Sequence, residues 1–243
     1  MNINATGLDY RELNETLRQV RGSCTITNCL GQRFIAAGIS DKTLTISGIP
    51  GNALGAYLNG AKIEVKGNAQ DAVGDTMNDG TIVIHGNVGD AVGYAMRGGR
   101  IYVQGNAGYR AGIHMKAYKD KQPALVIGGR AGSFLGEYQA GGTIIVLGMD
   151  GSGKDDQRPI VSNFPCTGMH GGKMYLRSDC KGIHFPHQVH TRPADSADLD
   201  DIAHYLRRFC YYFGHKLEEL LDHPFTVVTP DSSNPYRQMY VAN

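Results

Sequence analysis

GNAQDAVGDTMNDGTIVIH (67–85) is followed at once by GNVGDAVGYAMRGGRIYVQ (86–104), a second copy of the same pattern. The opening glycines of successive copies lie nineteen residues apart, at Gly48, Gly67, Gly86 and Gly105. A second glycine follows each of these after seven residues, and the pattern resumes later at Gly129, Gly136 and Gly148. A fixed short period indicates stacked copies of one structural unit.

Each copy ends in a stretch whose apolar residues lie two and four positions before its closing glycine. This alternation is typical of a strand with one buried face. The residues between the apolar ones are often polar, as at Lys62, Glu64 and Lys173. The seven pairs are Leu44/Ile46, Ile63/Val65, Ile82/Ile84, Ile101/Val103, Leu125/Ile127, Ile144/Val146 and Met174/Leu176, with Ser178 in place of the last closing glycine.

Nineteen residues are too few for a strand, a packed helix and two turns, but they suffice for one coil of a β-solenoid. The sequence therefore predicts an all-β fold, a single-stranded right-handed parallel β-helix of about seven coils. Stacking would align Asn68, Asn87 and Asn106 into a ladder. Because apolar residues keep phase with the glycines, a flexible glycine-rich segment is disfavoured. The copies also lack the GxGxxG of a dinucleotide-binding fold.

The two ends of the chain lack the nineteen-residue repeat and have helical spacing of apolar residues instead. Residues 9–20 have helical apolar spacing, which predicts a helix that caps the first coil and covers its strand edge. A second amphipathic helix is predicted from Ser196 to Gly214, followed by a short helix at 215–221 and an extended segment at 225–230. We divide the chain into an N-terminal capping segment (1–24), the β-helix (25–178) and a C-terminal helical segment with an extended tail (179–243).

Charge, hydrophobicity and cysteine content limit which partners and which cellular compartment the sequence favours. The net charge is +1 and no basic stripe is present, which argues against nucleic acid. No apolar run approaches a membrane span, and the N-terminus does not resemble a signal peptide, so we expect no membrane association. The five cysteines are irregularly spaced, which favours a reducing, cytoplasmic location over a disulfide framework.

The fourth copy, GYRAGIHMKAYKDKQPALVIGG (108–129), is five residues longer than its neighbours. Insertions in solenoid repeats form loops on one face, which is often the binding face. The insertion is either an ordinary solvated loop or a contact loop near a partner or its cofactor, and we take it, with the next coil, as the candidate partner interface. Its candidate residues are Arg110, His114, Lys116, Lys119, Lys121, Glu137 and Tyr138.

Other motifs predict no chemistry. GMDGSGKD (148–155) matches the spacing of a P-loop, but Asp155 stands where Ser or Thr holds magnesium and Pro159 prevents a following helix, which favours a solvated loop. His184, His187 and His190 match no zinc spacing and are interpreted as surface or interface histidines. No spacing indicates a nucleophile with its base or a pair of carboxylates, so we predict no catalytic, cofactor-binding or metal-binding residue.

Residues 67–116 and 128–148 resemble the GXGXG domain of glutamate synthase large subunits, which is a C-terminal right-handed β-helix. GLDYRELNETLRQ (7–19) and GQRFIAAGI (31–39) are similar to the stretch that precedes the repeats in that family. The segments FTVVTP (225–230) and NPYRQMY (234–240) resemble stand-alone GXGXG subunits of archaea and some bacteria.

The resemblance implies a non-catalytic scaffold subunit that organises a glutaminase-type subunit and an FMN-binding glutamate synthase subunit. FMN and an iron–sulfur cluster would belong to the partners, with no cofactor in this chain, and homo-oligomers are an alternative assembly. Three other functions stay open. They are the solenoid subunit of formylmethanofuran dehydrogenase, the GXGXG subunit of an N-methylglutamate synthase-type enzyme, and a free-standing structural solenoid.

Overall fold

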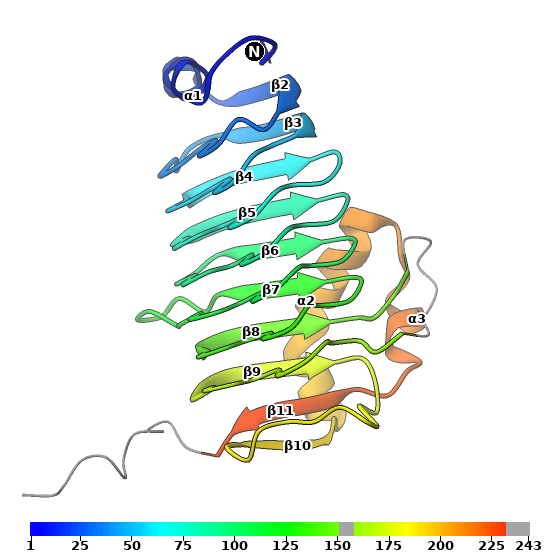
Figure 1. Cartoon of the computed structure of the whole chain (residues 1–243). Coiled ribbons are helices and arrows are strands. Elements are labelled where there is room, and N and C mark those ends of the chain that lie inside the picture. Colours follow the sequence, from blue (N-terminus) through cyan, green and yellow to red (C-terminus); the bar gives the residue numbers. More distant parts are fainter. Residues whose placement is uncertain (151–157, 232–243) are drawn as a thin grey trace, which may run out of the picture.

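A computed structural model describes residues 1–150 and 158–231 of the chain. Its strands form one sheet in the order β1-β2-β3-β4-β5-β6-β7-β8-β9-β11-β10, stacked as the coils of a solenoid (Figure 1). The parallel strands are β1 (Asn2–Asn4), β2 (Ser23–Leu30), β3 (Thr43–Ile49), β4 (Asn59–Val65), β5 (Asp79–Ile84), β6 (Arg100–Val103), β7 (Ala124–Ile127), β8 (Ala140–Val146) and β9 (Gly171–Leu176). The fold is the predicted all-β parallel β-solenoid.

The inner face of the sheet is a continuous apolar column. Ile63, Ile82 and Ile101 pair in register from β4 to β6, and each is fully buried. All fourteen residues of the seven predicted pairs have 0% exposure, which confirms the inward face of every pair. The predicted asparagine ladder is also present, since the backbone N–H of Asn87 donates to Asn68 Oδ1 at 2.8 Å and that of Asn106 to Asn87 Oδ1 at 2.7 Å.

The solenoid has about eight coils rather than the seven predicted, because one coil precedes the glycine repeats. Cys24 and Ile26 of β2 pair with Leu44 and Ile46 of β3 and point into the same column. No closing glycine marks this coil. Asn28 adopts the left-handed conformation there, with φ 55°, which asparagine tolerates better than most residues.

Helix α1 (Tyr10–Gln19) covers the first coil, close to the predicted 9–20. Asp9 accepts hydrogen bonds from the backbone of Arg11 and Glu12, and the Glu12 side chain in turn accepts one from the backbone of Asp9. This reciprocal capping fixes the start of the helix. Leu13 and Leu17 are fully buried, so the amphipathic face closes the end of the column.

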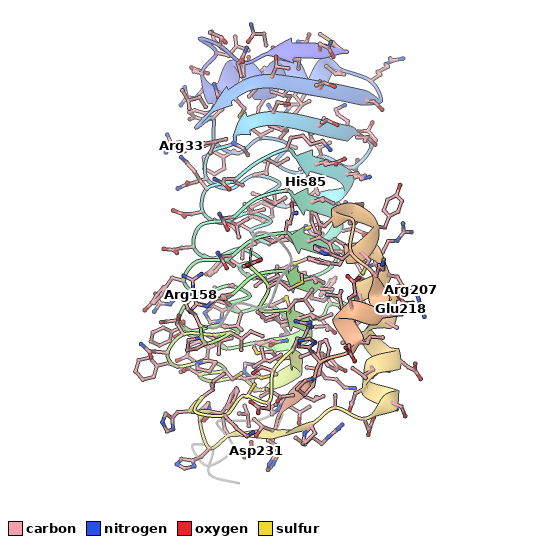
Figure 2. The ribbon with its side chains drawn as sticks, turned by 90° about the vertical axis from the view of Figure 1, so that its right-hand side faces the viewer. Arg33, His85, Arg158, Arg207, Glu218 and Asp231 are labelled. Atoms are coloured by element: carbon pink, nitrogen blue, oxygen red, sulfur yellow. The ribbon has the colours of Figure 1, made fainter. Side chains whose placement is uncertain are left out.

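Helix α2 (Ser196–Phe213) lies along the outer face of the sheet, with Arg207 on its solvent side (Figures 1 and 2). Asp195 caps its start, and Gly214 caps its end in the left-handed conformation, with φ 77°. The predicted alternation of apolar and polar residues is wrong for the strands beneath α2, because the residues between the inward pairs are apolar or aromatic there. A second core forms from these strand residues and α2, and its fully buried members include Val83, Tyr102, Val126, Ile145, Tyr175, Leu206 and Phe209.

The last strands reverse direction and end the parallel stack. Strand β11 (Thr226–Pro230), the predicted extended segment, pairs antiparallel with β9 on one side and with β10 (Val189–Pro193) on the other. Helix α3 (Leu217–Leu221) is shorter than the predicted 215–221. The tail beyond Asp231 and most of the P-loop-like segment 148–155 lie outside the described residues. Within the described chain, no helix has both the length and the apolar character to cross a membrane.

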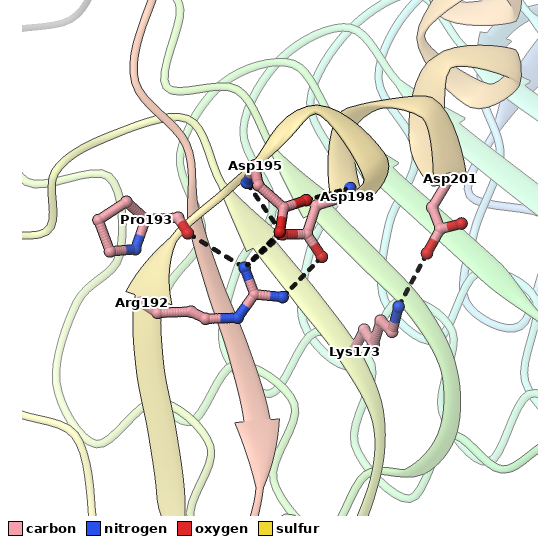
Figure 3. Close-up of polar contacts among 6 residues, drawn as sticks. All are labelled: Lys173, Arg192, Pro193, Asp195, Asp198 and Asp201. Atoms are coloured by element: carbon pink, nitrogen blue, oxygen red, sulfur yellow. Dashed lines mark hydrogen bonds and ion pairs between the residues drawn. The ribbon is translucent and has the colours of Figure 1, made fainter.

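An ion pair ties β10 to the first turn of α2 (Figure 3). The guanidinium of Arg192 donates to both carboxylate oxygens of Asp198, at 2.5 and 2.9 Å, and Asp198 is 4% exposed. The backbone N–H of Asp195 donates to the same carboxylate at 3.0 Å. The hydrogen bonds from Arg192 hold the pKa of the Asp198 carboxyl below its usual value.

We expect Asp198→Asn to lower the free energy of unfolding by about 2 kcal/mol at neutral pH, as the loss of a charge-assisted pair implies. Because the folded pKa lies below the unfolded value of about 3.9, the pair stabilises the fold above that pH. Its contribution is lost as the pH falls through the folded pKa. Urea unfolding of both proteins should therefore show a difference that shrinks below about pH 4.

Asp201→Asn is the matched control. Its carboxylate pairs with Lys173 at 2.8 Å, but the two side chains are 58% and 46% exposed (Figure 3). Solvent screening leaves such a pair below about 1 kcal/mol. Equal effects of the two substitutions, or a difference for Asp198→Asn that does not change with pH, would contradict the assignment.

Candidate functional site: an aromatic corner

Each coil turns a corner through alternate residues in the left-handed conformation. In one copy these are Ala72, Gly74 and Thr76, with φ of 55°, 70° and 50°. The N–H groups of Ala72 and Thr76 donate to the next coil at 2.8 Å, and the N–H of Gly74 donates back to the preceding coil at 2.8 Å. The corner is thus hydrogen-bonded to both neighbours, and three columns of left-handed residues run along the solenoid.

The middle column faces inward, which explains its glycines. A Cβ on Gly74 would lie 2.4 Å from Ile101 Cδ1, and one on Gly112 would lie 2.5 Å from Ile144 Cδ1. The two flanking columns can carry side chains. In the two coils before the insertion they hold only small residues, Ala72 with Thr76 and Ala91 with Ala95, whereas the first coils carry Phe34 and Tyr57 at these positions.

Around the insertion, the flanking columns change from small residues to large ones. One column continues through Arg110, Phe134 and Phe164, with φ of 57°, 61° and 57°. The other continues through His114 and Tyr138, with φ of 54° and 53°. The left-handed conformation costs about 1–2 kcal/mol for such residues, and alanine serves elsewhere in the columns, so stacking alone does not require these side chains. Residues held in costly backbone conformations often serve a functional site.

These side chains stack on one another. Phe134 lies between Tyr109 and Phe164, with ring centroids 5.3 and 5.2 Å apart. His114 stacks on Tyr138 at 5.2 Å with the rings 7° from parallel. The ring of Tyr94 meets the His114 ring edge-on at 6.0 Å. We call this surface the aromatic corner, and it comprises Tyr94, Tyr109, Arg110, His114, Phe134, Tyr138 and Phe164.

Arg110 joins the aromatic corner to a buried carboxylate. Its Nε donates to Glu137 Oε2 at 2.7 Å, and Glu137 is 7% exposed. The guanidinium lies 4.9 Å from the Tyr109 ring centroid and 5.4 Å from that of Phe134, within range of a cation–π contact. The hydrogen bond to Glu137 raises the pKa of Arg110 and holds its guanidinium in place against the two rings.

Comparison with protein families finds a match to the GXGXG motif family over residues 10–231. The chain belongs to the GXGXG family. It is also similar to an uncharacterized protein of Methanocaldococcus jannaschii, with 45% identity over 249 aligned positions. The alignment covers 98% of this chain and 95% of that relative, so this GXGXG chain is similar to it over nearly the full length of both.

The predicted interface residues of this GXGXG chain fall into three groups. Arg110, His114 and Tyr138 come together in the aromatic corner, and Glu137 accepts the hydrogen bond from Arg110 beside it. Lys121 lies elsewhere, because its Nζ contacts Asp79 Oδ2 at 3.0 Å beside the start of β5.

Lys116 and Lys119 lie on the exposed insertion, which doubles back through mutual backbone hydrogen bonds between Tyr118 and Lys121. Arg97 of the preceding coil stacks on the Tyr118 ring at 4.1 Å, which ties the insertion to that coil.

Sequence reasoning missed four aromatic members of the corner, Tyr94, Tyr109, Phe134 and Phe164. One signal was available in the aligned copies. Where the copies before the insertion carry Ala53, Ala72 and Ala91, the later ones carry Arg110 and Phe134.

The cysteines of the GXGXG chain are poor nucleophiles. Burial raises the pKa of all five thiols, to about 11 for Cys29 and Cys210. At neutral pH they are therefore protonated, whereas thiol catalysis requires the thiolate. Across residues 1–150 and 158–231, no three His, Cys, Asp or Glu side chains gather in a group that could hold a metal ion, and this includes His184, His187 and His190.

Proposed function

We propose that this chain is a non-catalytic scaffold subunit of a glutamate synthase-like glutamine amidotransferase complex. It would organise a glutaminase-type subunit and an FMN-dependent synthase subunit, with FMN and the iron–sulfur cluster held by those partners. The observation that carries the proposal is the family match, which covers most of the chain with a domain of the kind found in glutamate synthase large subunits.

The described structure supports a role through surfaces. One sheet connects all the coils, with a fully buried inner column, so the chain presents fixed faces along its length. Its thiols are protonated at neutral pH, which leaves them unsuited to the attack on glutamine that a cysteine glutaminase performs. The aromatic corner shows that exposed side chains are held in place on one of these faces.

The test is co-expression with the glutaminase-type and FMN-dependent synthase chains of the same organism. We expect the three to elute together in size-exclusion chromatography, and glutamine-dependent glutamate formation to require all three. The chain alone should carry no flavin absorbance and should not hydrolyse glutamine. Partners that assemble and turn over at the full rate without this chain would contradict the proposal, as would glutamine hydrolysis by the isolated chain that is lost on substitution of one of its own residues.

A further inference from the structure

We propose that the aromatic corner is the docking surface for a partner protein that presents apolar side chains bordered by carboxylates. This inference rests on the proposed function, because it states which face of the scaffold a partner subunit contacts and what chemistry that partner offers. Four properties of the corner support it: the exposure of its rings, their rigidity, the charge around them, and the contrast with the small residues that the same columns hold in the two coils before the insertion.

The aromatic corner exposes rings that a protein surface could cover. Tyr94, Tyr109 and Phe164 are 39%, 38% and 62% exposed, although the apolar column of the solenoid is close by. They come from three of the four stacked coils that form the corner, and the half-buried ring of Phe134 lies on the coil between those of Tyr109 and Phe164. Aromatic residues and arginine are the types most enriched among the residues that dominate binding energy at protein interfaces.

The corner is ordered before any partner arrives. Phe134 contacts both Tyr109 and Phe164, and His114 contacts both Tyr94 and Tyr138. The left-handed residues of the corner are also hydrogen-bonded to the next coil. The backbone N–H of Phe134 donates to the carbonyl oxygen of Asn163 at 2.9 Å, and that of Tyr138 donates to the carbonyl oxygen of Thr167 at 2.8 Å. Side chains that are already immobilised lose little entropy on binding, which favours affinity.

Charge identifies the kind of partner. The insertion and its approach, residues 110–121, contain four cations (Arg110, Lys116, Lys119 and Lys121) and one acid (Asp120), a net charge of +3. Lys121 is paired with Asp79, but Lys116 and Lys119 are exposed on the insertion, which follows His114 directly in the chain. Arg110 remains half-exposed above the buried Glu137. A partner with carboxylates around apolar side chains would complement this surface in both respects.

Alanine variants can test the corner without disturbing the coil. The double substitution Tyr138→Ala and Phe164→Ala places alanine where the same two columns already hold Ala95, at φ 49°, and Ala53, at φ 62°. Tyr57→Ala is the matched control, since Tyr57 is 57% exposed, has φ 56° and lies in the same column as Tyr138, but four coils earlier.

The measurement is calorimetric titration of each variant with the purified FMN-dependent synthase chain of the same organism. We expect Tyr57→Ala to bind like the wild type and the double variant to bind about 30-fold more weakly, the loss of a buried aromatic hot spot. Lys116→Glu with Lys119→Glu should weaken binding about 10-fold and reduce its salt dependence, because it reverses the proposed complementarity. Thermal unfolding should show that all variants remain folded.

The outcomes separate this inference from the proposed function. If the wild type binds and the double variant binds equally well, docking at the corner is wrong while the scaffold function stands. The same holds if Tyr57→Ala loses as much affinity as the double variant. If the wild type instead pairs with a second copy of itself through the corner, the rings serve self-association and the inference is overturned. A wild-type chain that does not bind the synthase chain at all removes both.

Discussion

Ile84→Asp should prevent folding of the solenoid. Ile84 has 0% exposure and pairs in register with Val65 on one side and Val103 on the other, so a carboxylate at this position has only aliphatic neighbours in its column. The desolvation of an unpaired charge costs several kcal/mol even after relaxation, which is comparable to the whole stability of a typical domain. We expect insoluble protein, or soluble protein without a cooperative thermal transition by circular dichroism.

Thr43→Asp is the appropriate comparison. Thr43 is exposed at the start of β3 and pairs with Lys62 of β4, so an aspartate there has water and an opposite charge beside it. Its melting temperature should stay within a few degrees of the wild type. A cooperative transition of normal midpoint for Ile84→Asp would show that this position is not in a dry column.

Gly80→Ala should be strongly destabilising although it adds only one methyl group. A Cβ on Gly80 would lie 2.3 Å from the backbone oxygen of Ala61 in the preceding coil, and the residue has φ 106°. Since the obstacle is backbone, it cannot move aside as a side-chain end can, and the two coils must separate locally. Left-handed strain and overpacking together imply a loss of about 4 kcal/mol in the free energy of unfolding, measurable by urea denaturation.

Gly182→Ala isolates the contribution of the backbone conformation. Gly182 has φ 81°, but a Cβ there would meet no atom within 4 Å. We expect this variant to lose only about 1 kcal/mol. If the two alanine variants were equally stable, close approach between coils would not be the reason for glycine at position 80.

The inward face of the solenoid was predictable because two independent patterns agree there. The period-two alternation assigns the strand, and its fixed phase with the glycines assigns the same face in every copy. The first coil was missed because Asn28 stands where the later copies carry a closing glycine, so this coil lacks the glycine spacing that reveals the others.

The second core was only partly visible. The apolar stripe of α2 and the apolar middle residues of the later strands, such as Val83, Val126 and Ile145, are both present in the sequence. Neither pattern predicts that α2 packs on the outer face of the sheet, because that contact depends on the path of the chain after β9. The aromatic corner was hidden for a related reason. Exposed rings and cations become a site only when the backbone brings neighbouring coils into register. The left-handed conformation of Phe134 and Tyr138 cannot be predicted from their residue types, because aromatic residues rarely adopt it.

The position of α2 divides the molecule mechanically. In a solenoid each coil touches only its neighbours, so coils can open one by one from an end. α2 packs across β5 to β9, and a coil in that span cannot open without lifting a helix that also rests on the others. Among the described residues, no residue of β3 or β4 belongs to this second core, and β4 meets the helix through Lys62, whose Nζ lies 5.3 Å from the Tyr212 ring centroid, so these coils form the more compliant part of the solenoid. The rings of the aromatic corner lie on coils within the span that α2 covers. We therefore expect the distances between these rings to vary less than distances within the coils of β3 and β4.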